Sequence, residues 1–230
     1  MKQFIYVALI AFVVMTAGNV NAVIESTDHN LSSVGPSTMA DRSSDEDQIC
    51  IFCHTPHTAA ASTGAEPLWN HTTNAAAGPY GVYSSATFDE TGYSDIADIA
   101  AGGVNASLLC MSCHDGTIAV NSLYNESTVG TPTMGAGTEL TGDVITSTAN
   151  LGTDLSDDHP VNMTYFLSVN APSEDPLQWN NTAAVSNDLL IGGKVQCASC
   201  HYAHGTTAGY TALLREDPAG SALCLRCHAK

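Results

Sequence analysis

The sequence predicts a chain with little regular secondary structure, in which short helices form at four cysteine motifs and few short strands occur. Three observations lead to this expectation. Helical periodicity of the apolar residues is weak, and Gly, Ser, Thr, Asn and Pro interrupt the whole chain. Aromatic residues make up only 7% of the 230 residues, so few large side chains can fill a core. Eight cysteines fall into four pairs of equal spacing, which indicates that something bound at these pairs organises the fold.

The N-terminus has the pattern of an export signal. Lys2 supplies a positive charge, residues 4–17 are apolar, and Val20-Asn21-Ala22 is a typical cleavage sequence. The apolar run is shorter than the ~20 residues that span a bilayer, which disfavours a retained membrane anchor. We therefore expect residues 1–22 to be a cleaved signal peptide and residues 23–230 to form a single domain.

The chain is strongly acidic, with 23 Asp and Glu residues against six Lys and Arg. Such a charge balance repels nucleic acid and anionic membrane surfaces. It excludes these two classes of partner and does not bear on the fold.

A histidine directly follows each of the four cysteine pairs. An even number of cysteines in an exported chain usually suggests disulfides, and two four-cysteine zinc sites are a second interpretation. Four histidines at the same position favour instead the c-type haem attachment motif, Cys-x-x-Cys-His. The motif residues are Cys50, Cys53 and His54; Cys110, Cys113 and His114; Cys197, Cys200 and His201; and Cys224, Cys227 and His228.

The spacing of the motif has a chemical reason. Two thiols on one helical turn can reach both vinyl groups of a single porphyrin, while the next residue places its imidazole over the iron. We expect four covalently attached haems c and the multihaem cytochrome c fold class, mostly irregular with a core formed by the four haems. Outside the motifs, residues 94–103 are the most helix-like segment, and residues 131–142 are expected to be loop or a short edge strand.

Function depends on the sixth ligand of each iron. An iron with an open position can bind and reduce a substrate, whereas an iron closed by a second histidine mainly passes electrons. Four irons need four distal ligands, and five histidines lie outside the proximal positions: His29, His57, His71, His159 and His204.

Two of these histidines follow a proximal histidine by three residues. His57 cannot pass around the porphyrin plane from the side of His54, so it ligates a different haem or none. His204 stands in the same relation to His201. We expect both to be distal ligands that bring neighbouring haems close together.

The remaining distal ligands must come from elsewhere in the chain. His159 is a good candidate, since Pro160 restricts its backbone and acidic neighbours can support an imidazole N–H. Methionine is the alternative type of axial ligand, but three methionines outside the signal and the motifs are better explained as core or loop residues: Met39, Met134 and Met163.

His29 and His71 compete for the fourth position. Residues 66–72 resemble residues 175–182, where Asn181 stands in place of His71. This internal similarity suggests that the Pro-Leu-Trp-Asn element has a packing role that does not need the histidine. We therefore favour His29.

In combination, these segments resemble the tetrahaem cytochromes c with doubled Cys-x-x-Cys-His motifs that metal-reducing bacteria produce. The resemblance runs from His29 to Lys230 and rests on "ICIFCHTPHTA", "PLWN", "CMSCHDGTIAV", "DLSDDHPV", "VQCASCH" and "SALCLRCH". Similar proteins have a His-Asn-Leu-Ser-like stretch before the first motif, and their residue at the position of His71 is often not histidine. The resemblance implies that His29 is a ligand.

Some members of this group polymerise into extracellular filaments in which one histidine reaches an iron of the adjacent subunit. By resemblance, an N-terminal arm bearing His29 would suit that role. The implied partners are other redox proteins, extracellular electron acceptors and further copies of the chain, and the implied location is outside the cell or on its outer surface. A periplasmic location is the alternative.

The sequence thus predicts an electron carrier with four bis-histidine haems c, and not an enzyme. A soluble periplasmic shuttle would have the same motifs and differ only in assembly. A haem reductase for nitrite or a related oxyanion is a less favoured alternative, because it needs an open iron and the chain has few cationic residues to bind an anion.

Overall fold

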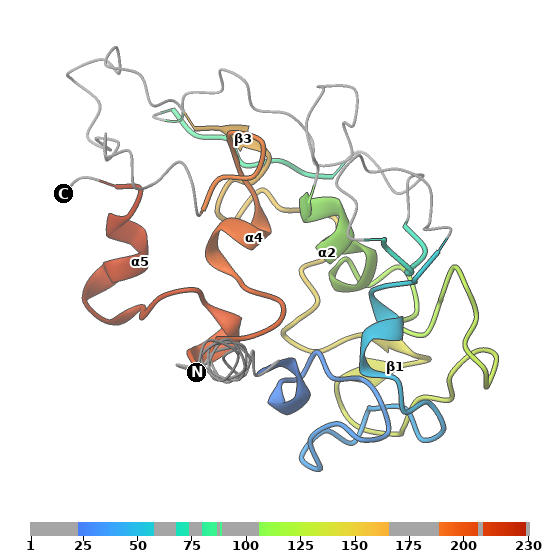
Figure 1. Cartoon of the computed structure of the whole chain (residues 1–230). Coiled ribbons are helices and arrows are strands. Elements are labelled where there is room, and N and C mark those ends of the chain that lie inside the picture. The colour runs from blue at the N-terminus through green and yellow to red at the C-terminus, as the bar shows by residue number, and fades with distance from the viewer. Residues whose placement is uncertain are drawn as a thin grey trace, which may run out of the picture.

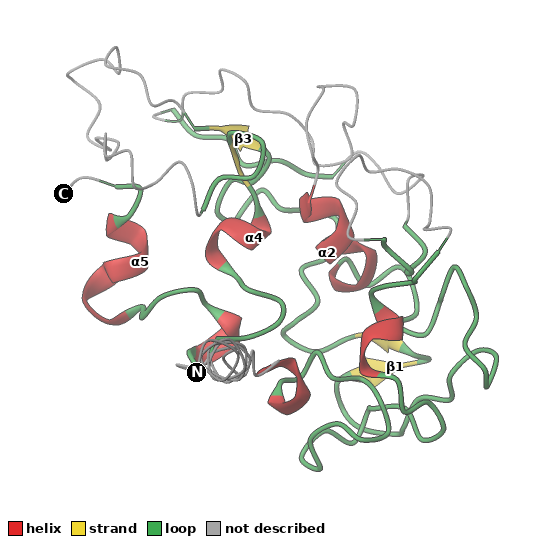
Figure 2. Ribbon diagram, viewed as in Figure 1, coloured by secondary structure: helices red, strands yellow, loops and turns green. Residues whose placement is uncertain are grey.

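The structure is a computed structural model, and it describes residues 23–57, 68–73, 80–86, 88, 106–165, 189–206 and 209–228. Loops connect short elements throughout this part of the chain (Figure 1, Figure 2). The expectation of a mostly irregular fold with short helices and few strands is confirmed. The helix-like segment 94–103 lies outside the described residues.

A short helix occurs at each of the four cysteine motifs. The helices are η2 (Ile49–Phe52), α2 (Ala106–His114), α4 (Cys197–Cys200) and α5 (Ala222–Leu225). Three further 3-10 turns lie outside the motifs: η1 (Val23–Ser26), η4 (Thr211–Leu213) and η5 (Ala219–Ser221). Helical structure in the described residues is thus concentrated where the sequence places the attachment motifs.

Two small antiparallel sheets complete the regular structure. One pairs β1 (Leu140–Thr141) with β2 (Val144–Ile145), and the other pairs β3 (Met163–Thr164) with β4 (Lys194–Val195). Gly142 and Asp143, which join β1 to β2, both have positive φ, as the tightest hairpin turns require. The expectation that residues 131–142 are loop or edge strand is met, since β1 occupies their C-terminal end.

The apolar cores of the described residues are small. One surrounds Met111 of α2 and contains Tyr80, Leu108 and Leu155. The other lies at the β3–β4 sheet and contains Met163, Tyr165 and Val195. No helix in the described part of the chain is both long and apolar enough to cross a membrane.

A buried polar network joins the second motif to the third. Ser107 of α2 contacts the Gln196 side chain through its hydroxyl group, and that hydroxyl accepts a 3.0 Å hydrogen bond from the backbone N–H of Cys197. The Gln196 amide donates to Asn162 at 3.2 Å. Gln196 is fully buried, so these bonds hold α2 and α4 side by side (Figure 1).

A second buried amide joins the first motif to the segment that follows the second. Asn70 donates from its side chain to the carbonyls of Ile51 at 2.8 Å and Asn125 at 3.1 Å, and it accepts from the Asn125 N–H at 2.8 Å. Asn70 is completely buried. The packing role expected of the Pro-Leu-Trp-Asn element therefore has a structural basis in this amide.

Candidate haem-attachment site

The backbone of each motif forms the turn that the attachment chemistry needs. In three motifs the histidine N–H donates to the carbonyl of the first cysteine, at 2.7 Å for His54, 3.0 Å for His201 and 2.9 Å for His228. His114 is the last residue of helix α2. In every motif the two thiols and the imidazole consequently belong to one helical turn.

The environments of five cysteines favour neutral sulfur, namely Cys53, Cys110, Cys113, Cys200 and Cys227. Cys197 is the exception, because its hydrogen bond with Cys110 lowers its pKa to about 7. All eight cysteines are free thiols in the structure. Burial raises the pKa of Cys53 to about 11 and that of Cys113 to about 12. Zinc requires thiolates, whereas a thioether carries no charge and suits a buried site. Among the described residues, which include every cysteine, no three His, Cys, Asp or Glu side chains converge as metal ligands would.

Six of the nine histidines form three pairs of neighbouring rings. The ring centres of His54 and His204 are 6.0 Å apart, those of His29 and His114 are 6.0 Å apart, and those of His159 and His228 are 6.3 Å apart. Each pair joins one motif histidine to one histidine from outside the motifs. The structure thus brings together three of the four proximal histidines with three of the four expected distal ones.

In four histidines, three of them in ring pairs, Nδ1 and not Nε2 is directed at a backbone carbonyl. Nδ1 of His114 lies 2.8 Å from the Ala149 carbonyl, and Nδ1 of His29 lies 3.0 Å from the Ala203 carbonyl. His159 and His201 also direct Nδ1 at a backbone carbonyl, at 3.0 and 2.7 Å. A carbonyl at Nδ1 favours the tautomer in which Nδ1 carries the proton and Nε2 has the free lone pair, as metal-binding histidines require.

His71 has a different environment. Its ring is completely buried, and both nitrogens face carbonyls: Nδ1 lies 2.9 Å from the Thr72 oxygen and Nε2 lies 2.9 Å from the Ala119 oxygen. Neither nitrogen is directed at another histidine. The geometry is that of a structural residue, while His29 lies opposite His114.

We expect the stability of the protein to depend on the protonation of His71. Burial lowers the pKa of His71 from its usual value of 6.5, although the two carbonyls act in the opposite direction. The unfolded chain therefore binds the proton more tightly, and the free energy of unfolding should fall as the pH drops below 6.5. His71→Gln should lower that free energy by ~1–3 kcal/mol at neutral pH and weaken its decline in acid.

Urea unfolding at several pH values, followed by circular dichroism, measures both effects. His57→Ala, compared with the wild type as single copies, is the matched control, because His57 is exposed and its substitution should change the stability of a single copy by less than ~0.5 kcal/mol. Equal pH dependence in the wild type and His71→Gln would contradict this role for His71.

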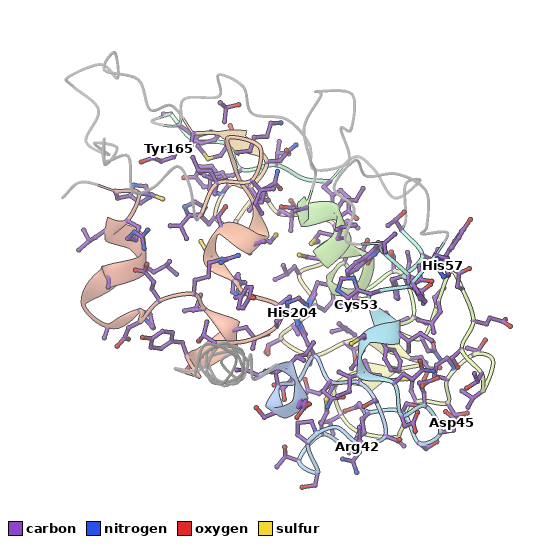
Figure 3. All side chains as sticks on the ribbon, viewed as in Figure 1. Arg42, Asp45, Cys53, His57, Tyr165 and His204 are labelled. Carbon is purple, nitrogen blue, oxygen red and sulfur yellow. The ribbon has the colours of Figure 1, made fainter. Side chains whose placement is uncertain are left out.

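Besides His71, two further histidines form no ring pair, namely His57 and His201. The described residues include all nine histidines, and neither of these two has a ring contact among them. Both are exposed. In the view of Figure 3, His57 lies farther from the centre than His204, which is itself exposed. The sequence expectation that His57 serves a neighbouring iron has no counterpart within the described chain.

The partners of Nδ1 are functional groups that sequence reasoning did not identify. They are backbone carbonyls of three alanines and one proline, namely Ala149, Ala203, Ala212 and Pro160. Any residue can supply a backbone carbonyl, so no sequence signal marks these positions.

Comparison with known proteins identifies part of the chain. Residues 191–230 match the family described as "Doubled CXXCH motif", and this segment contains the third and fourth motifs. No curated protein sequence matches the chain. The match supports a multihaem c-type cytochrome, whose motifs bind haem c and whose general activity is electron transfer.

Proposed function

We propose that residues 23–230 form an exported electron carrier that holds four haems c through its eight cysteines. The observation that carries this proposal is the set of three histidine ring pairs. An imidazole nitrogen binds a first-row metal at ~2.0 Å and lies ~1.1 Å from its ring centre, so two imidazoles on opposite sides of one ion have ring centres ~6 Å apart. The observed separations of 6.0, 6.0 and 6.3 Å agree with this spacing.

From these pairs we infer a distal ligand for three of the four motifs. His204 serves the first motif, whose proximal ligand is His54, and His29 serves the second, with His114. His159 serves the fourth motif, with His228. Bound haem c supplies an iron that takes up and releases one electron. At these three motifs two histidines would hold the iron and would leave no position for a substrate, which suits electron transfer rather than catalysis.

The third motif is different, because its His201 has no histidine opposite it within the described chain. His57 is the unused, exposed histidine. We assign His57 as the distal ligand of the third motif in a neighbouring copy, so that copies join head to tail. This arrangement parallels filament-forming tetrahaem cytochromes such as outer-membrane cytochrome E. In this arrangement His57 has the intersubunit role that the resemblance implied for His29, because His29 faces His114 of its own chain.

A second candidate function rests on the same feature. If copies do not assemble, the iron at His201 has an open position, which is what a reductase for nitrite or a related oxyanion requires. Arg215 lies beside this motif: its side chain donates to the Ala198 carbonyl at 2.6 Å, and its guanidinium carbon lies 5.0 Å from the Tyr202 ring centre. Steady-state nitrite reduction by single copies would support this function over the carrier.

Haem content tests the main proposal. The chain, produced in a host that attaches haem c, should gain the mass of four haems and lose residues 1–22, as intact-protein mass spectrometry will measure. Electron paramagnetic resonance of single copies should show low-spin ferric signals from three irons and a high-spin signal from the fourth. Fewer than four attached haems, or two four-cysteine zinc sites without haem, would overturn the proposal.

A further inference from the structure

A buried hydrogen-bond donor lies beside the first motif. The indole Nε1 of Trp69 is inaccessible to solvent and has no hydrogen-bond partner among the described residues. The Trp69 ring stands edge-on to the His54 ring, with ring centres 6.3 Å apart and an angle of 86° between the planes. The orphaned donor therefore adjoins the proximal ligand of the proposed first haem.

The backbone holds Trp69 in this position. His54 and Trp69 form an isolated antiparallel bridge. On one side of it the Thr55 N–H donates to the Leu68 carbonyl at 2.9 Å, and on the other the Asn70 N–H donates to the Cys53 carbonyl at 2.9 Å. The indole is thus attached by main-chain bonds to the attachment turn itself. The Trp69 backbone cannot move away from the attachment turn without breaking them.

An indole N–H can only donate, and leaving it buried without an acceptor costs ~1–3 kcal/mol. Folded proteins rarely accept that cost, so a partner from outside the chain is expected. In a haem c whose ring nitrogens bind iron, the acceptors that remain are the carboxylates. Each haem carries a pair of them, so four haems bring more carboxylates than the chain has Lys and Arg residues, which number six. Neutral donors must serve some of them.

We propose that Trp69 binds the haem of the first motif by donating its Nε1–H to a haem carboxylate. This inference rests on the proposed function, since it requires a haem at Cys50 and Cys53. The hydrogen bond withdraws negative charge from the carboxylate. The electrostatic potential at the iron is then less negative. Its loss should favour the ferric state, because the oxidised iron carries the larger positive charge.

The test is Trp69→Phe in the haem-loaded chain, which keeps an aromatic ring and removes the N–H. One of the four reduction potentials should fall, with the equilibrium constant for reduction decreasing about threefold to tenfold, up to ~59 mV. The propionate bending band in the resonance Raman spectrum should shift as well. Tyr124→Phe is the control, because it removes a hydroxyl from an exposed ring and should change neither quantity.

If Trp69→Phe does not fold, benzothienylalanine at position 69 in a Trp179→Phe background keeps the indole shape and replaces the N–H with sulfur. Unchanged potentials and propionate bands in a variant with full haem content would overturn the inference and indicate that water satisfies the donor. A wild-type chain without a haem on Cys50 and Cys53, shown by peptide mass spectrometry, would instead refute the proposed function. The two failures are therefore distinguishable.

Discussion

Replacing His204 with alanine should convert the iron of the first motif from low-spin to high-spin while leaving the haem content unchanged. The His204 ring lies 6.0 Å from the His54 ring, and no other histidine ring in the described residues contacts His54. Attachment depends on Cys50 and Cys53, which this substitution does not touch. One of the four irons should therefore acquire an open position, and electron paramagnetic resonance and the visible spectrum will report it.

A methionine substitution provides a sharper version of this experiment. His204→Met keeps a sixth ligand but changes its chemistry, and a Met/His iron has a higher reduction potential than a bis-histidine iron. Redox titration should show one component rising while the other three stay close to their wild-type values. His71→Gln is the control for losing a histidine that lies opposite no motif, and it should leave all four spin states unchanged.

One result would contradict the assignment of His204 as the distal ligand of the first motif. If His204→Ala retains the wild-type number of low-spin irons in single copies, the ring pair is ordinary packing and the first haem takes its ligand elsewhere. Parallel substitutions of His29 and His159 would then show whether the other two pairs fail in the same way.

Replacing His57 with alanine should prevent head-to-tail assembly without affecting haem attachment. His57 is exposed, and among the described residues only its backbone carbonyl has hydrogen-bond partners, the side chains of Thr55 and Asn125. Its imidazole is therefore available to a neighbouring copy. Losing a metal–nitrogen bond between copies should weaken their association by at least ~100-fold, which corresponds to ~2.8 kcal/mol.

Electron microscopy and light scattering measure the assembly, and electron paramagnetic resonance measures the iron. Wild-type polymer should have four low-spin irons per chain, whereas His57→Ala should remain dispersed with one high-spin iron. Added imidazole should return that iron to the low-spin state without restoring assembly. Fibres formed by His57→Ala, or wild-type chains that remain dispersed at every concentration, would contradict the intersubunit bond.

Local sequence was sufficient to predict the attachment turns. The spacing of Cys-x-x-Cys-His is short, and the turn closes through a bond between its own ends, such as that from the His54 N–H to the Cys50 carbonyl. The scarcity of regular structure was also predictable, because Gly, Ser, Thr, Asn and Pro interrupt every apolar pattern in the chain. These features depend on neighbouring residues, and they require no knowledge of distant contacts.

The pairing of histidines could not be obtained in this way. Residue order says that His29, His159 and His204 are available, but it does not say which motif each one faces. His29 reaches His114 because the Ala203 carbonyl, 174 positions away in the sequence, holds its ring. Such a contact depends on how loops without periodic patterns cross one another, and no local propensity encodes it.

The choice between His29 and His71 also depended on tertiary contacts and could not be made from local sequence. Composition and spacing leave both as candidate ligands, and an internal similarity only favoured His29. In the folded chain both nitrogens of His71 face carbonyls, while His29 has a hydrogen-bond partner only at Nδ1 among the described residues. The sequence alone therefore establishes which groups can bind a haem. Their assignment to particular sites comes from tertiary contacts, since a ligand acts only where the fold directs its lone pair.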